Sequence, residues 1–307
     1  MSAKRKPVRA TEQRNPRTRG LDLRSTQNLL RALNREDATV PRAVASEIPA
    51  IARAVETMAH ALNSGGRIFY VGAGTSGRLA TLDASELPPT FGVSPQKFQA
   101  IIAGGTRALT NAVEGAEDSS SQGAKDLAAR RVTNRDVVVG ITASGLTPYV
   151  LGALAAAKRK GAATIGITSN RNSPLAKAVK ILIATNTGPE AITGSTRLKA
   201  GTAQKLVLNM LSTATMVQLG RVYDNWMIGV ALTNQKLRKR GQRILQEASG
   251  ASVSAAARAL RQGGHDPCIA LIMLKKKVSA AEAQLLLSAA YGNMRRALGE
   301  LRNQFKK

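Results

Sequence analysis

The chain has 307 residues, 43% of them hydrophobic and 3% aromatic, and its formal net charge at pH 7 is +26. No apolar stretch approaches the roughly 18 residues of a membrane-spanning helix, and the basic N-terminus lacks the apolar segment of a secretory signal. Cys268 is the single cysteine and cannot form an internal disulfide, which is typical of a cytoplasmic protein. With only His60 and His265 beside it, no Cys/His metal cluster can form, so we expect no metal ion.

Residues 1–45 are predicted to form an exposed basic arm, because basic residues crowd the first 24 positions and the segment contains Pro7, Pro16 and Pro41. Further basic runs at 236–243 and 275–277 belong to expected helix surfaces. We interpret the charge mainly as a solvated basic surface that requires no nucleic acid. Non-specific binding of nucleic acid stays open, although so few aromatic residues argue against base stacking.

Strand-like and helical segments alternate after residue 39. One helix is predicted at 39–66, with Pro41 in its first turn, and segments such as 147–161 are rich in helix formers. Five short, β-branched apolar runs predict buried strands at 67–74, 98–105, 136–145, 162–170 and 180–188. Continuous apolar strands separated by helices predict an α/β domain over 46–235, with a doubly wound parallel sheet covered on both faces.

The last third of the chain is predicted to be helical. A long, largely buried helix is expected at 199–219, and strand signals disappear beyond about residue 235. The Ala- and Leu-rich tail is divided by Gly263-Gly264 and by Gly292, which predicts three short helices. We therefore expect a small all-α domain over 236–307.

The loop after the first strand, GAGTSG at 72–77, matches the G-x-G-x-x-G pattern of dinucleotide-binding folds. Such folds also need an acidic residue at the end of the second strand, where this chain has Ala-Gly-Gly-Thr at 103–106. Thr75 and Ser76 instead add hydroxyls to the amides of a helix N-terminus, a combination that binds one phosphate. A phosphomonoester is favoured over a dinucleotide, and a purely structural tight turn stays open.

A second strand-to-helix turn is also rich in hydroxyls. The strand that ends near residue 141 is followed by Thr142, Ser144 and Thr147, with Gly145 among them. Ser and Thr are ordinary helix caps, so capping is the alternative interpretation. Open α/β sheets bind ligands at the carboxyl ends of their strands, and two hydroxyl-rich turns there predict a shared phosphate site.

Longer segments of the chain resemble the N-acetylmuramic acid 6-phosphate etherase family, which has the SIS (sugar isomerase) fold. The resemblance extends from about residue 11 to the C-terminus and is weakest in the terminal helices. DASE-x-PPT-x-G and AVEGAEDS are its most specific motifs, and the matching segments are 11–26, 72–92, 103–119, 143–150 and 193–213. It implies a flavodoxin-like, parallel-sheet SIS sandwich with a small C-terminal domain of the ubiquitin-associated (UBA-like) type.

The resemblance implies a lyase that cleaves the D-lactyl ether of N-acetylmuramic acid 6-phosphate, giving N-acetylglucosamine 6-phosphate and D-lactate in peptidoglycan recycling. Opening of the sugar ring exposes an aldehyde, which acidifies the C2 proton. A base removes this proton, an acid protonates the departing lactate oxygen, and water adds back. Such a route needs two proton-transfer groups and no cofactor. Family members are homodimers with sites near the subunit boundary, where the helix at 199–219 either meets the partner or packs within its own chain.

The resemblance assigns the proton donor to Glu86 in DASELPP and the second catalytic residue, the C2 base, to Glu117 in AVEGAEDS. Apolar neighbours are expected to desolvate Glu86, so that it holds its proton at neutral pH. The nearest rivals are Asp83 and Glu114. The phosphate ligands carry over as Ser76, Thr142, Ser144 and Thr147, with Thr75 beside them.

The predicted site also has three candidate cationic side chains, and its second loop differs in part from the family pattern. Arg78, Arg197 and Lys199 are candidate charge partners for the phosphate, and each is also explained as a structural or surface cation. The second loop of SIS proteins commonly reads S-x-S-G-x-T. Here Thr142 replaces the first serine and keeps the hydroxyl, whereas Leu146 stands where many etherases have arginine.

Two other classes of function stay open. An aldose–ketose isomerase on the same fold needs a similar base and phosphate pocket, but generic isomerase domains lack the two glutamate motifs. A non-catalytic sugar-phosphate sensor is the other class. A repressor would need a helix-turn-helix domain before the sheet, and a kinase regulator would need a second sugar-binding domain.

Overall fold

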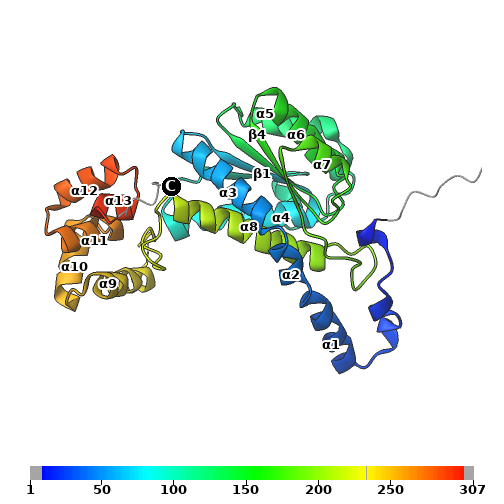
Figure 1. Cartoon of the computed structure of the whole chain (residues 1–307), viewed down its shortest axis with the longest axis horizontal. Helices are drawn as coiled ribbons and strands as arrows, with labels where there is room; N and C mark the ends of the chain where they lie inside the picture. The colour runs from blue at the N-terminus through cyan, green and yellow to red at the C-terminus, as the bar shows by residue number, and fades with distance from the viewer. Residues whose placement is uncertain (1–8, 233, 301–307) are drawn as a thin grey trace, which may run out of the picture. The chain divides into compact units, whose positions relative to one another are not determined.

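The computed structural model describes residues 9–232 and 234–300. Its centre is a parallel five-stranded sheet in the order β2-β1-β3-β4-β5 (Figure 1). The strands are β1 (Ile68–Gly72), β2 (Phe98–Ile102), β3 (Val137–Ile141), β4 (Ala163–Thr168) and β5 (Ile181–Ala184). Each lies within a predicted apolar run, so the predicted doubly wound sheet is confirmed.

Helices cover both faces of the sheet, as Figure 1 shows. One face carries α5 (Ser120–Ala129), α6 (Pro148–Arg159) and α7 (Pro174–Ala178). The other carries α3 (Ile48–Asn63), α4 (Gly74–Phe91) and α8 (Lys199–Gln218). Between the sheet and α6, Phe69, Val138 and Tyr149 belong to a fully buried apolar core. Because both faces of the sheet are buried, its strands need continuous apolar runs rather than alternating ones.

The single helix predicted at 39–66 is wrong, because the structure has two helices there. α2 (Val40–Ala45) ends before α3 begins, and Pro49 lies in the first turn of α3. Proline is accepted at that position because its missing N–H has no intrahelical partner to lose. The predicted end of the helix is confirmed, since α3 stops at Asn63 just before Gly65, which has a φ of +82°.

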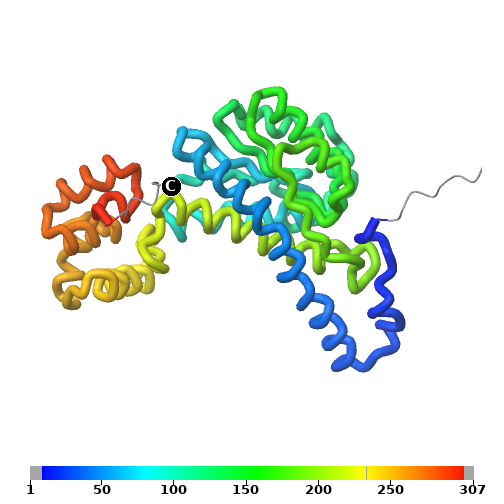
Figure 2. The backbone as a smooth tube through the Cα atoms, in the orientation of Figure 1, coloured from blue at the N-terminus to red at the C-terminus, as the bar shows by residue number. Residues whose placement is uncertain are grey.

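The N-terminal segment differs from the exposed arm that was predicted. Its described part forms η1 (Ala10–Glu12), η2 (Pro16–Thr18), η3 (Leu21–Leu23) and α1 (Thr26–Asp37). Figure 2 shows α1 running back alongside residues 9–24. Thr18 Oγ1 donates to the carbonyl of Ala191 at 2.8 Å, and the amide of Gly194 donates to the carbonyl of Thr11 at 3.2 Å. These hydrogen bonds hold the segment against the loop before α8, and part of the segment is buried there.

A buried ion pair fastens α1 to the start of α8. Lys199 Nζ lies 2.7 Å from Glu36 Oε2, and the two side chains are 0% and 3% exposed. Arg17 and Asn15 also donate to the Glu36 carboxylate, at 2.5 and 2.8 Å. The hydrogen bond from Arg17 is the main cause that lowers the pKa of Glu36 to about 2, against the opposing effect of burial. Lys199 is therefore a structural cation and not a charge partner of the phosphate.

The described residues form two compact units. The first contains residues up to 85 and 96–212, and the second contains 86–95 and 213–300. Within the second unit, a Cβ on Gly92 would lie 2.7 Å from the carbonyl oxygen of Gly229, so the end of α4 touches the segment before the C-terminal helices. The DASELPPTFG motif is consequently divided, with Asp83 in the first unit and Glu86 in the second.

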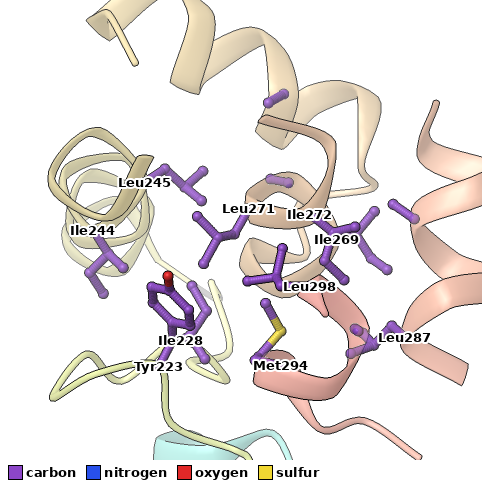
Figure 3. Close-up of a cluster of buried hydrophobic side chains, with 14 of the residues drawn as sticks. Tyr223, Ile228, Ile244, Leu245, Ile269, Leu271, Ile272, Leu287, Met294 and Leu298 are labelled. Atoms are coloured by element: carbon purple, nitrogen blue, oxygen red, sulfur yellow. The ribbon is translucent and has the colours of Figure 1, made fainter. Parts of the chain in front are cut away.

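Between residues 234 and 300 the second unit contains five C-terminal helices, so the prediction of three is wrong. They are α9 (Gln235–Ser249), α10 (Val253–Gln262), α11 (Pro267–Lys276), α12 (Ala280–Ala289) and α13 (Met294–Leu298). The basic run 236–243 forms much of the exposed surface of α9, whose Ile244 and Leu245 enter the core around Leu271 (Figure 3). Among the described residues, no helix combines the length and the apolar content that crossing a bilayer requires.

Candidate active site

The first loop places hydroxyls and amides at the N-terminus of α4. Because α4 begins at Gly74, the amides of Gly74, Thr75 and Ser76 have no acceptor within the helix. Ser76 is buried, and its Oγ donates to Oε1 of Gln204 on α8 at 2.9 Å. Free amides and hydroxyls at a helix N-terminus are the groups that bind an anion.

Each glycine of the G-x-G-x-x-G pattern has a structural reason. A Cβ on Gly72 would lie 2.7 Å from the amide nitrogen of Gly77, and one on Gly77 would lie 2.5 Å from Cγ1 of Ile102. Gly74 has a φ of +52°, which L side chains rarely adopt. A purely structural tight turn therefore explains the three glycines. It does not explain the hydroxyls of Thr75 and Ser76, which indicate a ligand.

In the second loop, three hydroxyls bond to one another. Thr142 Oγ1 lies 2.7 Å from Thr147 Oγ1 and 3.4 Å from Ser144 Oγ, and Ser144 Oγ accepts the amide of Leu146 at 3.2 Å. Thr147 is the N-cap residue of α6 but makes no capping hydrogen bond with its side chain. The capping interpretation is therefore wrong for Thr147, because its hydroxyl is directed to Thr142.

The two loops leave neighbouring strands at the same end of the sheet. Gly72 of β1 pairs with Ile141 of β3, and the strand order reverses between these strands. This switch point is where open α/β sheets bind ligands. Thr168, the last residue of β4, and Asn170, just after the strand, hold the second loop by donating to the carbonyls of Ala143 and Ser144. The sequence predicts neither contribution, because a polar residue at a strand end or in a loop carries no periodic signal.

A cavity of about 190 Å³ lies beside the first loop. Its lining includes Gly74, Arg78, Glu114 and Glu117, so one predicted catalytic glutamate lies next to the predicted phosphate loop. Arg78 Nε donates to the carbonyl of Ala108 at 3.0 Å, which holds the segment after β2 in place. Glu114 shares the cavity with Glu117 and stays its rival.

Glu86 is exposed on α4, so the apolar burial predicted for its carboxyl is absent from the single chain. Its neighbours Ala84 and Leu87 are buried, at 8% and 3% exposure. Successive helical residues point about 100° apart, so an apolar neighbour in sequence does not cover the glutamate. Arg197 is exposed as well. Within 9–232 and 234–300, no three His, Cys, Asp or Glu side chains gather as possible metal ligands.

Asp83, the rival of Glu86, is half-buried between α4 and α8. Its Oδ1 accepts the hydroxyl of Ser212 at 3.0 Å, while its Oδ2 is buried and has no hydrogen-bond partner at ordinary distance within residues 9–232 and 234–300. Burial raises the pKa of Asp83 to about 6, and the hydrogen bond from Ser212 opposes this effect. Burial, with Asp83 as a secondary cause, also raises the pKa of Tyr70.

Asp83→Asn should raise the free energy of unfolding by up to about 3 kcal/mol at pH 8. The folded protein must ionise a carboxyl with a pKa of about 6, against an ordinary value of 3.8. The gain should shrink as the pH falls through 6 and vanish below 3.8, where the carboxyl is protonated in both states. Urea denaturation at pH 8 and pH 4 measures it, with the exposed Asp22→Asn as control. An equal gain at both pH values would contradict the explanation.

Comparison with known proteins identifies the family. A model described as the glucokinase regulatory protein N-terminal SIS domain matches residues 50–158, and the SIS domain model matches 109–214. An N-acetylmuramic acid 6-phosphate etherase of Serratia proteamaculans is 52% identical over 94% of this chain and 97% of its own. Relatives of the same name from Oceanobacillus iheyensis and Clostridium beijerinckii are 48% and 46% identical, over 93% and 96% of this chain and 97% of theirs. The chain therefore belongs to the N-acetylmuramic acid 6-phosphate etherase family.

Proposed function

We propose that this protein is a carbon–oxygen lyase that converts N-acetylmuramic acid 6-phosphate and water into N-acetylglucosamine 6-phosphate and D-lactate. The observation that carries the proposal is the 52% identity to an etherase over 94% of the chain. The two hydroxyl-lined loops at the switch point of the sheet support it, because they offer a phosphate site and no acidic residue for a dinucleotide ribose.

The phosphate would be anchored at the meeting point of the two loops. It accepts hydrogen bonds from the amides of the first turn of α4 and from Ser76, with Thr75 nearby. On its other side it accepts hydrogen bonds from the hydroxyls of Thr142, Ser144 and Thr147, which bond to one another in the free protein. The partial positive charge at the start of α4 adds to this attraction.

Glu117 and Glu86 would transfer the protons. With the sugar ring open, Glu117 takes the C2 proton that the C1 aldehyde acidifies. The C3–O bond breaks as Glu86 protonates the departing lactate oxygen, which leaves a C2–C3 double bond. Water then adds its hydroxyl to C3 and a proton returns to C2. Elimination followed by hydration causes no net oxidation or reduction, so two proton-transfer groups are sufficient.

We also propose a cytoplasmic homodimer with its sites near the subunit boundary. In this assembly residues 46–235 form the catalytic domain and 236–307 a helical accessory domain, and the basic segment 1–45 is held to the catalytic domain by the contacts of Thr11, Thr18 and Glu36. The exposure of Glu86 in the single chain supports a boundary location, because a general acid needs a less aqueous environment to keep its proton. Light scattering after size exclusion measures the oligomeric state, and a monomer at micromolar concentration would contradict this part.

Incubation with N-acetylmuramic acid 6-phosphate in water labelled with deuterium and ¹⁸O tests the reaction. D-lactate should appear without solvent ¹⁸O, and the amino-sugar phosphate should carry deuterium at C2 and ¹⁸O at C3. An isomerase would exchange the C2 hydrogen without releasing lactate, and a sensor would bind the substrate unchanged. Absence of lactate at micromolar enzyme would therefore overturn the proposal.

Ser76→Ala and Ser144→Ala should each raise KM for the sugar phosphate about tenfold with little change in kcat. Each variant removes one hydrogen bond to a charged group, which contributes about 1.5 kcal/mol. Initial rates over a range of substrate concentrations measure the effect. Ser46→Ala is the control, because its hydroxyl is exposed and donates to the carbonyl of Ala43. Unchanged constants in both loop variants would remove the phosphate assignment.

A further inference from the structure

We infer that Gln204 is a positioning residue for the substrate phosphate and acts by fixing the hydroxyl of Ser76. This inference rests on the phosphate site proposed above and deepens it. Gln204 lies on α8, far from both loops in sequence, and its side chain is 1% exposed. It belongs to the segment 193–213 that resembles the etherase family, but sequence alone suggested no role for it.

The hydrogen bonding of Gln204 is incomplete. Its Oε1 accepts the hydroxyl of Ser76 at 2.9 Å, whereas its Nε2 is buried and has no hydrogen-bond partner among the described residues. A buried polar group without a partner destabilises a protein by about 1–3 kcal/mol. Such groups are rare and often have a functional reason.

The beginning of α8 lies directly against the first loop. A Cβ on Gly201 would be 3.4 Å from Cγ2 of Thr75, and Gly201 and Gln204 share a helix face because they are three residues apart. Both contacts of α8 therefore fall on the first turn of α4, where the amides of Thr75 and Ser76 face the proposed phosphate. The unpartnered donor of Gln204 is next to that site.

The chemistry of the amide explains how Gln204 would act. In the free protein the Ser76 hydroxyl donates its single hydrogen bond to Gln204, so it cannot donate one to an anion. A half-turn of the amide would bring Nε2 to the Ser76 oxygen. Gln204 then becomes the donor and Ser76 the acceptor, and the Ser76 hydroxyl is free to donate its own hydrogen bond to the phosphate. Binding of a phosphomonoester thus provides a partner for the buried Nε2.

Two substitutions separate this role from simple packing. Gln204→Leu keeps the approximate volume but removes the donor and the acceptor, and Gln204→Glu keeps the shape but offers only acceptors when it is ionised. Both should raise KM about tenfold while kcat stays within about twofold. For Gln204→Glu alone, KM should fall toward the wild-type value at lower pH, because a protonated carboxyl is again a donor.

A double-mutant cycle tests whether Gln204 acts through Ser76. The Ser76→Ala/Gln204→Leu variant should have the KM of Ser76→Ala alone, because without that hydroxyl the amide has nothing to orient. If the two single substitutions raise KM by factors that multiply in the double variant, the inference is overturned. It is also overturned if Gln204→Leu lowers kcat and leaves KM unchanged. Gln218→Leu is the matched control, since Gln218 is an exposed glutamine on the same helix.

Binding of inorganic phosphate, measured by calorimetry, separates this inference from the proposed function because it needs no turnover. Weaker binding to Gln204→Leu than to wild type, with the fold intact by circular dichroism, supports the positioning role even if no lactate is released. Equal binding of phosphate by both proteins would overturn the inference even if the wild type is an active etherase.

Discussion

Glu86→Gln and Glu117→Gln should each lower kcat by at least about 10²-fold, while a sugar phosphate still protects the protein against thermal unfolding. The amide has the size of the carboxyl but cannot transfer a proton. The phosphate loops do not depend on either side chain, so binding should survive. Release of D-lactate under saturating substrate measures the loss, and the shift in Tm with added sugar phosphate measures the binding.

Isotope exchange should distinguish the two glutamates. Glu117→Gln should abolish exchange of the C2 hydrogen with solvent, because the base is missing. Glu86→Gln should retain this exchange and lose lactate release, because only the departing oxygen lacks its proton donor. If Glu114→Gln is inactive while Glu117→Gln keeps near wild-type turnover, Glu114 is the base, since both line the same cavity.

Glu36→Gln should lower the free energy of unfolding by about 3–5 kcal/mol at pH 7, because it leaves the fully buried Lys199 without a charge partner. Glu36 has a pKa of about 2 in the folded protein and an ordinary value of 4.5. Its stabilising effect is therefore complete above pH 4.5 and is lost as the pH falls toward 2. Urea denaturation of wild type and variant between pH 7 and pH 3 measures both effects.

Removing both charges gives the sharpest control. Glu36→Gln/Lys199→Met should recover much of the loss, because no unpaired buried charge remains. The exposed pair Arg243–Glu247, with side chains 76% and 40% exposed, provides the comparison, and Glu247→Gln should leave the free energy of unfolding almost unchanged. A double variant as unstable as the sum of both single variants would contradict the ion-pair explanation.

The five strands could be predicted because their signal is local. A strand covered on both faces needs a continuous apolar run, such as Val137 to Val139 in β3. The hydroxyl loops could be predicted for a related reason, since parallel strands bring all their carboxyl ends to one edge of the sheet. The family motifs extended this local reading to Glu86 and Glu117.

Partners that are distant along the chain could be decided only by the tertiary structure. Lys199 and Glu36 are 163 residues apart and Ser76 and Gln204 are 128 apart, so no periodic pattern links them. Exposure likewise depends on what packs over a side chain, which is why the apolar neighbours of Glu86 did not predict its environment. Apolar periodicity reports which face of an element is buried, whereas the choice of a polar partner depends on how the elements meet in space.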